Sequence, residues 1–185
     1  MSTPIDLGRP VSGDVVELIL DDHRRFEALL RDLRDSTSDR DAVRHAFATL
    51  HVAHAEAEEK SVYPKLRRKD AITEHEAEHG EEEHAEGNEA LLALLECKGT
   101  DTQNFDDAVE DLATALNHHI GEEEQTILNP ARTEVSQEVR EDLGAKWTAE
   151  RNRLLDEGAG SLTNVREIVA KAHKDGLLPA DDEDE

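Results

Sequence analysis

Apolar residues recur along most of the chain at the spacing of amphipathic helices, three or four positions apart. This pattern predicts four long helices separated by short polar or glycine-containing breaks. Asp14 caps the first helix, which ends before the polar break at 36–39. The others are expected over about 40–68, from 72 or 73 to 97, and from about 105 to Pro130. Because each carries one apolar stripe, we expect an all-α protein in which two helical hairpins form a four-helix bundle.

The segments outside these helices complete the expected domain organisation. Residues 1–13 contain prolines and glycines and are expected to form a flexible N-terminal arm, followed by the bundle over 14–133. Two further amphipathic segments predict additional C-terminal helices, in an extension over 134–176. We expect this extension either to pack outside the bundle or to contact a partner. The acidic end of the chain, 177–185, is expected to be disordered.

The net charge of −24, from 45 acidic and 21 basic residues, argues against several kinds of partner. Phosphate backbones and anionic membranes attract cationic surfaces, so we expect neither nucleic acid nor a membrane as a partner. The sequence shows no signal peptide and no long apolar run, and Cys97 is its one cysteine. We therefore expect a cytoplasmic protein without an internal disulfide, either a monomer or a weak homo-oligomer.

A histidine followed four residues later by a glutamate occurs twice in the same context. His54 precedes Glu58, and His119 precedes Glu123; an apolar run and then a proline follow each pair. Side chains four positions apart lie on one face of a helix, so each pair can reach a common point. The two pairs lie 65 residues apart in the chain, which indicates an internal duplication of a helical hairpin.

Two single histidines, His23 and His84, extend this duplication. His23 lies within the apolar stripe of the first predicted helix. His84 follows 61 residues later, and Leu91 and Leu95 set the buried direction of its helix. Counting back along that helix places His84 within about 20° of the buried direction. We therefore expect both histidines to face the interior of the bundle.

Other histidines in the helical region are expected to lie on the surface. His75 and His79 have the spacing of a metal-binding pair, but the phase of their helix turns them away from the buried stripe. His118 falls off the stripe that contains His119, and His51 lies at the flank of its helix.

The inward histidines and glutamates indicate a metal site. Burying four imidazoles and two carboxylates without partners would be costly. Imidazole together with carboxylate suits iron, zinc or manganese, and no thiolate belongs to the set. The set is too large for one ion with an open position, whereas two ions bridged by carboxylates would use all of it.

The order His, His-x-x-x-Glu, His, His-x-x-x-Glu resembles the haemerythrin-like (HHE cation-binding) family over about residues 14–130. The resemblance implies an up-down-up-down four-helix bundle that holds a non-haem centre of two iron ions, with iron preferred to zinc or manganese. The implied ligands are four terminal histidines and two bridging glutamates: His23, His54, His84 and His119, with Glu58 and Glu123.

The third helix departs from the oxygen-carrying members of that family, which have a His-x-x-x-His pair there. Here Gly80 and Asn88 stand one turn to either side of His84. The missing histidine leaves a coordination position open, or filled by Glu81 or His79. A more oxygen-rich set of ligands favours ferric iron, which argues against reversible oxygen carriage.

The resemblance implies a protein that binds or reacts with a small ligand, O2, NO or H2O2, in sensing, scavenging or defence against oxidative stress. An enzyme of this kind would be a peroxide- or NO-consuming di-iron oxidoreductase. The alternative is a protein that binds or buffers iron without turning over a small molecule. The sequence leaves these functions open.

Overall fold

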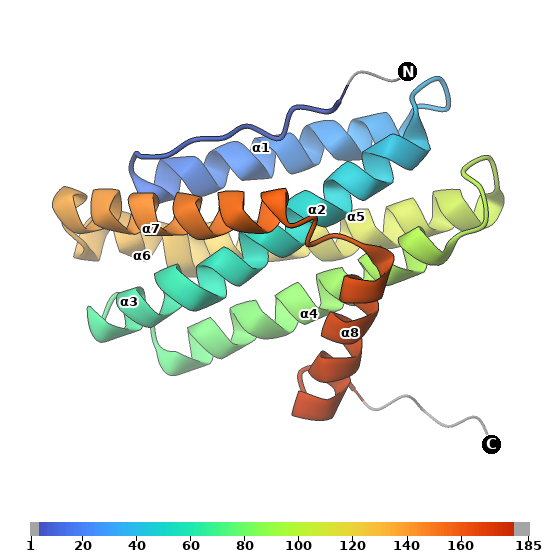
Figure 1. Ribbon diagram of the computed structural model, residues 1–185. Helices are drawn as coiled ribbons and strands as arrows, with labels where there is room; N and C mark the ends of the chain where they lie inside the picture. The colour runs from blue at the N-terminus through green and yellow to red at the C-terminus, as the bar shows by residue number, and fades with distance from the viewer. Residues whose placement is uncertain (1–3, 180–185) are drawn as a thin grey trace.

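The computed structural model describes residues 4–179, in which every regular element is a helix (Figure 1). The all-α class expected from the sequence is therefore confirmed for this part of the chain. Among the helices of this part, none has the length and apolar character needed to cross a membrane.

Four helical rods within the described residues make up what we call the helical core. They are α1 (Val15–Arg34), α2 (Arg40–Ala57) continued by η1 (Glu58–Val62) and α3 (Tyr63–Arg68), α4 (Glu74–Glu96), and α5 (Gln103–Glu123) continued by η2 (Glu124–Leu128) and α6 (Asn129–Glu134). α1 packs on α2, α2 on α4, α4 on α5, and α5 on α1. The rods therefore form a closed ring around a shared interior.

Side-chain caps begin the helices of the core, and apolar stripes hold the rods together. Asp14, Asp39, Thr73 and Thr102 each accept a hydrogen bond from a backbone N–H in the first turn of the following helix. The stripes bury large side chains from all four rods: Phe26, Leu33, Phe47, Leu50, Leu91, Leu94, Phe105 and Leu112. Each of these side chains stabilises the fold by about 1.5–3 kcal/mol through its removal from water.

Two π-helical turns, η1 and η2, carry the second and fourth rods past a proline. The sequence predicts that Pro64 bends or ends its helix, because proline has no N–H for the helical ladder. The rod instead widens ahead of it: the N–H of Tyr63 donates to the carbonyl of Glu58, five residues back, and α3 then continues the rod. η2 repeats this arrangement ahead of Pro130. Such π turns insert one extra residue into a helix and are frequent at functional sites.

Two further helices, α7 (Gln137–Asp156) and α8 (Leu162–Asp175), pack on the outside of the core. α7 lies against α1 and α2, and α8 lies against α4 (Figure 1). α7 buries Trp147 and Arg151 completely. Within the described residues the extension therefore packs outside the core, and its contact with a partner stays a prediction.

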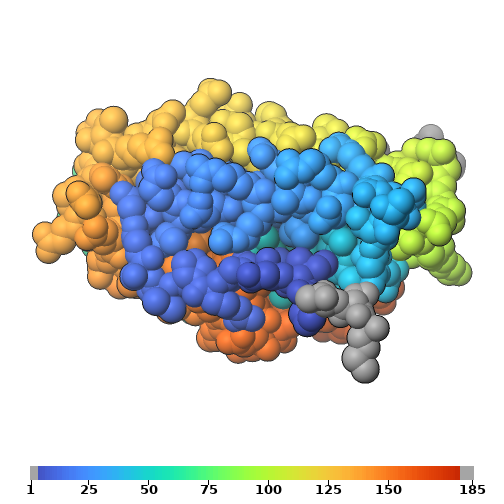
Figure 2. All heavy atoms as spheres, turned by 90° about the horizontal axis from the view of Figure 1, so that it is seen from above, coloured from blue at the N-terminus to red at the C-terminus, as the bar shows by residue number. Residues whose placement is uncertain are grey.

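Residues 4–13 are held against the molecule. The guanidinium of Arg151 donates hydrogen bonds to the carbonyl oxygens of Leu7 and Gly8, and the amide of Asn152 donates to the carbonyl of Pro10. Figure 2 shows this dark blue segment lying along α1. A buried arginine of the C-terminal extension thus binds the backbone of this segment, while the flexibility expected of the arm stays a prediction.

The predicted disordered tail, 177–185, lies outside the described residues from 180 onward, and for those residues disorder stays a prediction. Leu178, within the described part, is buried against the apolar interior. The apolar side chain of Leu178 thus belongs to the core, while the expected boundary at 177 stays a prediction.

Candidate metal centre

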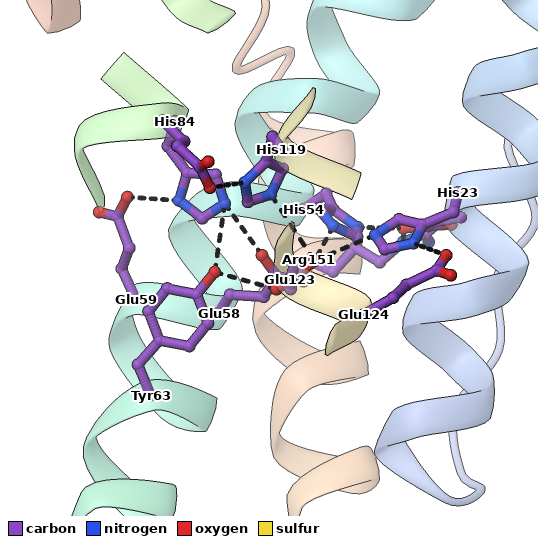
Figure 3. A network of polar contacts seen from close by, with 12 residues as sticks. His23, His54, Glu58, Glu59, Tyr63, His84, His119, Glu123, Glu124 and Arg151 are labelled. Carbon is purple, nitrogen blue, oxygen red and sulfur yellow. Dashed lines mark hydrogen bonds and ion pairs between the residues drawn. The ribbon is translucent and has the colours of Figure 1, made fainter. Parts of the chain in front are cut away.

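Polar side chains from all four rods meet in the interior of the helical core. They are between 0% and 4% exposed: His23 from α1, His54 from α2, Glu58 from η1, His84 from α4, and His119 and Glu123 from α5. Figure 3 shows the four imidazole rings approaching the two carboxylates. The four-residue spacing of the two repeated pairs accounts for this placement, because it puts each histidine one turn from its glutamate.

These side chains form two groups, each with three candidate ligand atoms that lie within 4.8 Å of one another. The first, which we call the His54 trio, is His23, His54 and Glu123, and the second, the His84 trio, is Glu58, His84 and His119. The structure thus brings together six of the seven residues expected from the sequence.

Glu58 belongs to the His84 trio and also lies next to His54 of the other trio. Its Oε1 lies 2.9 Å from Nε2 of His54, and its Oε2 lies 3.1 Å from Nε2 of His84. Neighbouring ligands of one ion are about 3 Å apart when metal–ligand bonds are about 2.1 Å long and meet at right angles. The two oxygens of Glu58 therefore lie where a carboxylate bridging two ions would place them.

Glu123 is placed in a similar way. Its Oε2 lies 3.1 Å from Nε2 of His23 and 3.6 Å from Nε2 of His119, so one oxygen faces a histidine of each trio. Its Oε1 accepts a hydrogen bond of 2.9 Å from the hydroxyl of Tyr63. Glu123 is the second residue that connects the two trios.

Behind each imidazole, Nδ1 faces a second carboxylate, and we call these four carboxylates the outer ring. The pairs are His54 with Asp22 at 3.0 Å, His84 with Glu59 at 2.8 Å, His119 with Glu83 at 2.9 Å, and His23 with Glu124 at 3.2 Å. In three pairs the carboxylate comes from the rod that precedes the rod of its histidine in the chain. In the fourth pair, Glu124 of the last rod faces His23 of the first, which closes the ring. An N–H at Nδ1 that donates to a carboxylate leaves the lone pair of Nε2 pointing inward, as in metal-ligating histidines.

Several inward atoms have no hydrogen-bond partner among the described residues. They are Nε2 of His54, Nε2 of His119 and both oxygens of Glu58. Although Nε2 of His54 and Oε1 of Glu58 are close, their approach lacks the angles of a hydrogen bond. Leaving a buried polar group without a partner costs about 1–3 kcal/mol. A metal ion held by each trio would satisfy all of these atoms, so the donor set fits a pair of bound cations.

The electrostatics of the centre favour positive charge. Burial alone would lower the pKa of His54, but the charge of Glu58 and the hydrogen bond to Asp22 outweigh burial and raise this pKa to about 10. Burial is likewise outweighed at His84, whose pKa is raised well above its usual value by Glu58 and Glu59. A site that draws protons this strongly onto its histidines would also stabilise a metal cation.

Tyr63 also belongs to the centre, which the sequence did not show. Besides donating to Glu123, its hydroxyl lies 3.5 Å from Nε2 of His84. Burial, followed by the charges of Glu123 and Glu58, raises the pKa of Tyr63 well above its usual value, so the phenol keeps its proton. A Cβ at Gly80 would lie 3.0 Å from this ring, so the glycine makes room for it. The tyrosine thus occupies the side of the centre where a histidine was expected to be missing.

Glu81, the seventh residue expected from the sequence, belongs to neither trio. It is half-buried and lines a groove of about 520 Å³ between the core and α8, together with Glu59. Burial, followed by the charge of Glu59, raises the pKa of Glu81. The outer-ring residue of α4 is Glu83 instead, which faces His119.

The histidines expected on the surface differ in how exposed they are in the structure. His75 and His118 are exposed, and His79 is half-exposed. His51 is buried, contrary to the expectation, and its Nδ1 pairs with Oδ1 of Asn88 at 3.0 Å. Burial, followed by the positive charges of nearby histidines, lowers the pKa of His51 to about 3, so it remains neutral. The helical phase places His51 at the flank of its helix, but the close approach of α4 buries the side chain there.

A hydrogen-bond path leads from the centre to α7. Asp22 accepts from His54 and forms two hydrogen bonds with Arg151, at 2.7 and 2.8 Å. Burial would raise the pKa of Asp22, but the hydrogen bonds from His54 and Arg151 lower it to about 2. The sequence reasoning missed this path and the outer ring. Their one visible signal is that each outer-ring carboxylate adjoins an expected ligand in the sequence, as Asp22 adjoins His23.

The fold and the site define a helical protein with buried histidine–glutamate clusters that could hold metal cations. Comparison with known families agrees with this class: the Hemerythrin HHE cation binding domain matches residues 14–130. The chain belongs to this family.

One curated relative is described as a DNA nickase, from Nostoc sp. (strain PCC 7120 / SAG 25.82 / UTEX 2576). It is 26% identical over 155 residues, which cover 82% of this chain and 43% of the relative. The chain thus spans less than half the length of that relative. No solved structure matches the chain.

Proposed function

We propose that the chain is a non-haem di-iron protein whose four rods form the up-down-up-down four-helix bundle of its family. The observation that carries this proposal is the position of Glu58, whose two oxygens face one histidine of each trio. Four imidazoles and two shared carboxylates suit a pair of iron ions, which are preferred here to zinc or manganese. His23, His54 and Glu123 would hold one ion, and the His84 trio would hold the other.

We further propose that the centre reacts with a small ligand, and that peroxide is the ligand which best fits the surroundings. When bound, two iron ions would supply the two-electron redox chemistry by which two molecules of H2O2 become two of H2O and one of O2. Cleavage of the O–O bond also needs protons at the oxygens. Tyr63 holds a proton between Glu123 and His84, in a buried site from which bulk water is excluded. This favours turnover of peroxide over reversible carriage of O2; NO remains a second ligand of suitable size.

Iron buffering is the alternative function, and the burial of the ligands argues against it. A buffer must exchange its ion with solvent, whereas all six candidate ligand residues are only 0–4% exposed within the core. The outer ring also holds every imidazole in place. A resident cofactor fits this arrangement better than a cargo ion.

DNA nicking, suggested by the name of the relative, has no comparable support in this chain. The net charge of −24 opposes contact with a phosphate backbone. Much of the relative also lies beyond the matched region. We therefore keep the expectation that nucleic acid is not a partner; the cytoplasmic location and the monomeric or weakly oligomeric state also stay predictions.

Oxygen release from peroxide by the iron-loaded protein tests the proposed function. We expect the wild type to release O2, and Tyr63→Phe to release it about 10²-fold more slowly, because the proton is lost. The iron content and the thermal stability of this variant should match the wild type, since the ring is kept. A stable oxygenated spectrum of the ferrous protein without peroxide turnover would contradict the proposal and favour O2 carriage. Rapid loss of iron to a chelator would favour buffering.

A further inference from the structure

A third group of candidate ligands lies outside the core interior, on the neighbouring helices α4 and α5. Its members are His79, Glu83 and His118, and one nitrogen or oxygen atom of each lies within 4.8 Å of the other two. The imidazoles are open to solvent, with side chains 44% and 58% exposed, whereas the side chain of Glu83 is only 4% exposed. The group therefore combines a buried carboxylate with two accessible histidines.

The carboxylate of Glu83 has two different environments. Its Oε2 pairs with Nδ1 of His119 at 2.9 Å, as a member of the outer ring. Its Oε1 is buried and has no hydrogen-bond partner among the described residues. The bond at Oε2 fixes the orientation of the carboxylate, so that Oε1 faces the two exposed imidazoles.

The distances around Oε1 match those between ligands of one ion. Oε1 lies 3.4 Å from Nε2 of His79 and 3.2 Å from Nε2 of His118, without the geometry of a hydrogen bond to either. In a tetrahedral site with bonds of about 2.05 Å, neighbouring ligand atoms are about 3.3 Å apart. Two histidines and one carboxylate with a fourth position open to water form a common set of zinc ligands.

We propose that His79, Glu83 and His118 bind one Zn²⁺ ion at the surface of α4 and α5, separately from the buried centre. The ion satisfies the unpaired oxygen of Glu83, and the two imidazoles supply neutral nitrogen ligands. The negative charge of the whole chain raises the local concentration of cations. Because Glu83 also faces His119, the zinc ion shares a carboxylate with the outer ring of the centre.

Zinc binding to the iron-loaded protein, measured by equilibrium dialysis with metal analysis, tests this site. We expect the wild type to bind one zinc ion more than His118→Ala or His79→Ala, with at least a tenfold loss of affinity in each variant. His75→Ala is the matched control, because His75 is exposed on the same helix, one turn from His79, but lies outside the trio. This control should bind zinc like the wild type.

Two results would overturn the proposal. One is equal zinc binding by the wild type, His79→Ala and His118→Ala. The other is an equal loss in His75→Ala, which would show general attraction to a histidine-rich surface. Iron is measured in the same samples and should not change. A parallel fall of iron and zinc in His118→Ala would contradict a separate site. The zinc result is a difference between variants, so it does not depend on which metal occupies the buried centre.

Discussion

At the scale of single residues, the centre depends on which nitrogen of each imidazole faces inward. The outer ring decides this, because each of its carboxylates pairs with Nδ1 and leaves Nε2 directed at Glu58 or Glu123. The meeting of these histidines and glutamates in the interior could be predicted from the spacing of the two pairs and from the helical phase of His23 and His84; that they bind metal stays a prediction. The outer ring could not be predicted, because an acidic residue beside a ligand gives no sign of which neighbouring helix it faces.

Replacing Glu59 by glutamine tests the outer ring. Glu59 lies 2.8 Å from Nδ1 of His84, and the amide should orient this ring less firmly. Loss of such a partner typically weakens metal binding by about 10–100-fold, and we expect that range for iron, measured by competition with a chelator. Glu56→Gln is the matched control, three residues earlier and outside the ring, and should leave the affinity unchanged. Equal affinities of Glu59→Gln and the wild type would exclude a role for the ring.

His51 predicts a specific dependence of stability on pH. Its pKa is lowered from 6.5 to about 3 in the folded protein, so the unfolded chain takes up a proton at higher pH than the folded chain. This contribution to stability is complete above pH 6.5 and is lost as the pH falls toward 3. Each pH unit below 6.5 removes about 1.36 kcal/mol of this contribution, so the free energy of unfolding falls by about 2 kcal/mol between pH 6.5 and pH 5.

The measurement compares urea unfolding of the wild type and His51→Gln at pH 7 and pH 5, at equal metal content. The variant should be less stable at pH 7, because it loses packing against Phe26 and Phe47, but it should lose about 2 kcal/mol less than the wild type on acidification. Identical losses in the two proteins would show that His51 is not held neutral.

At the scale of elements, the helices and their inward faces could be predicted from apolar spacing, but positions beyond the π turns could not. A π turn adds one residue, about 100° of helical rotation, so a phase counted from His54 no longer holds at Tyr63. The ring of Tyr63 thereby reaches the centre, where its hydroxyl donates to Glu123. The burial of His51 was missed for a different reason: it depends on how closely α4 approaches α2.

Gly87 permits this close approach of α4. A Cβ at this position would lie 2.9 Å from Nε2 of His51 and 3.1 Å from its Cε1. Gly87→Ala should therefore destabilise the protein by about 1–3 kcal/mol through overpacking. Gly121→Ala is the matched control, since a Cβ there meets no atom of the described residues within 4 Å. The control should be stabilised by about 0.5–1 kcal/mol, because alanine favours the helix. Thermal unfolding measures both, and equal effects of the two substitutions would contradict this packing.

At the scale of the whole molecule, the C-terminal extension supports the centre. Arg151 of α7 binds Asp22 on α1 and the backbone of residues 4–13, and Asp22 in turn holds His54. The sequence predicted the helices of the extension but not this function, because a single arginine in a charged helix resembles its exposed neighbours.

Arg151→Ala should lower the free energy of unfolding by about 3–5 kcal/mol, because it leaves Asp22 buried without its ionic partner. Arg153→Ala removes an arginine from the same helix, but one that is about half exposed and pairs with Glu150 and Glu157. Its effect should stay within about 1 kcal/mol, as for other surface ion pairs. Urea unfolding of both variants measures the two free energies of unfolding. A small effect of Arg151→Ala would mean that the extension contributes little to the stability of the core.

The proposed di-iron centre requires that each of the two trios holds one ion. The most direct test is the iron content per chain of protein produced with iron, for the wild type and for the double variant His54→Ala, His119→Ala. We predict two iron ions per wild-type chain and almost none in the variant, because each trio loses one of its three candidate ligands. Well under two ions in the wild type, or an iron content that the double substitution leaves unchanged, would contradict the di-iron centre.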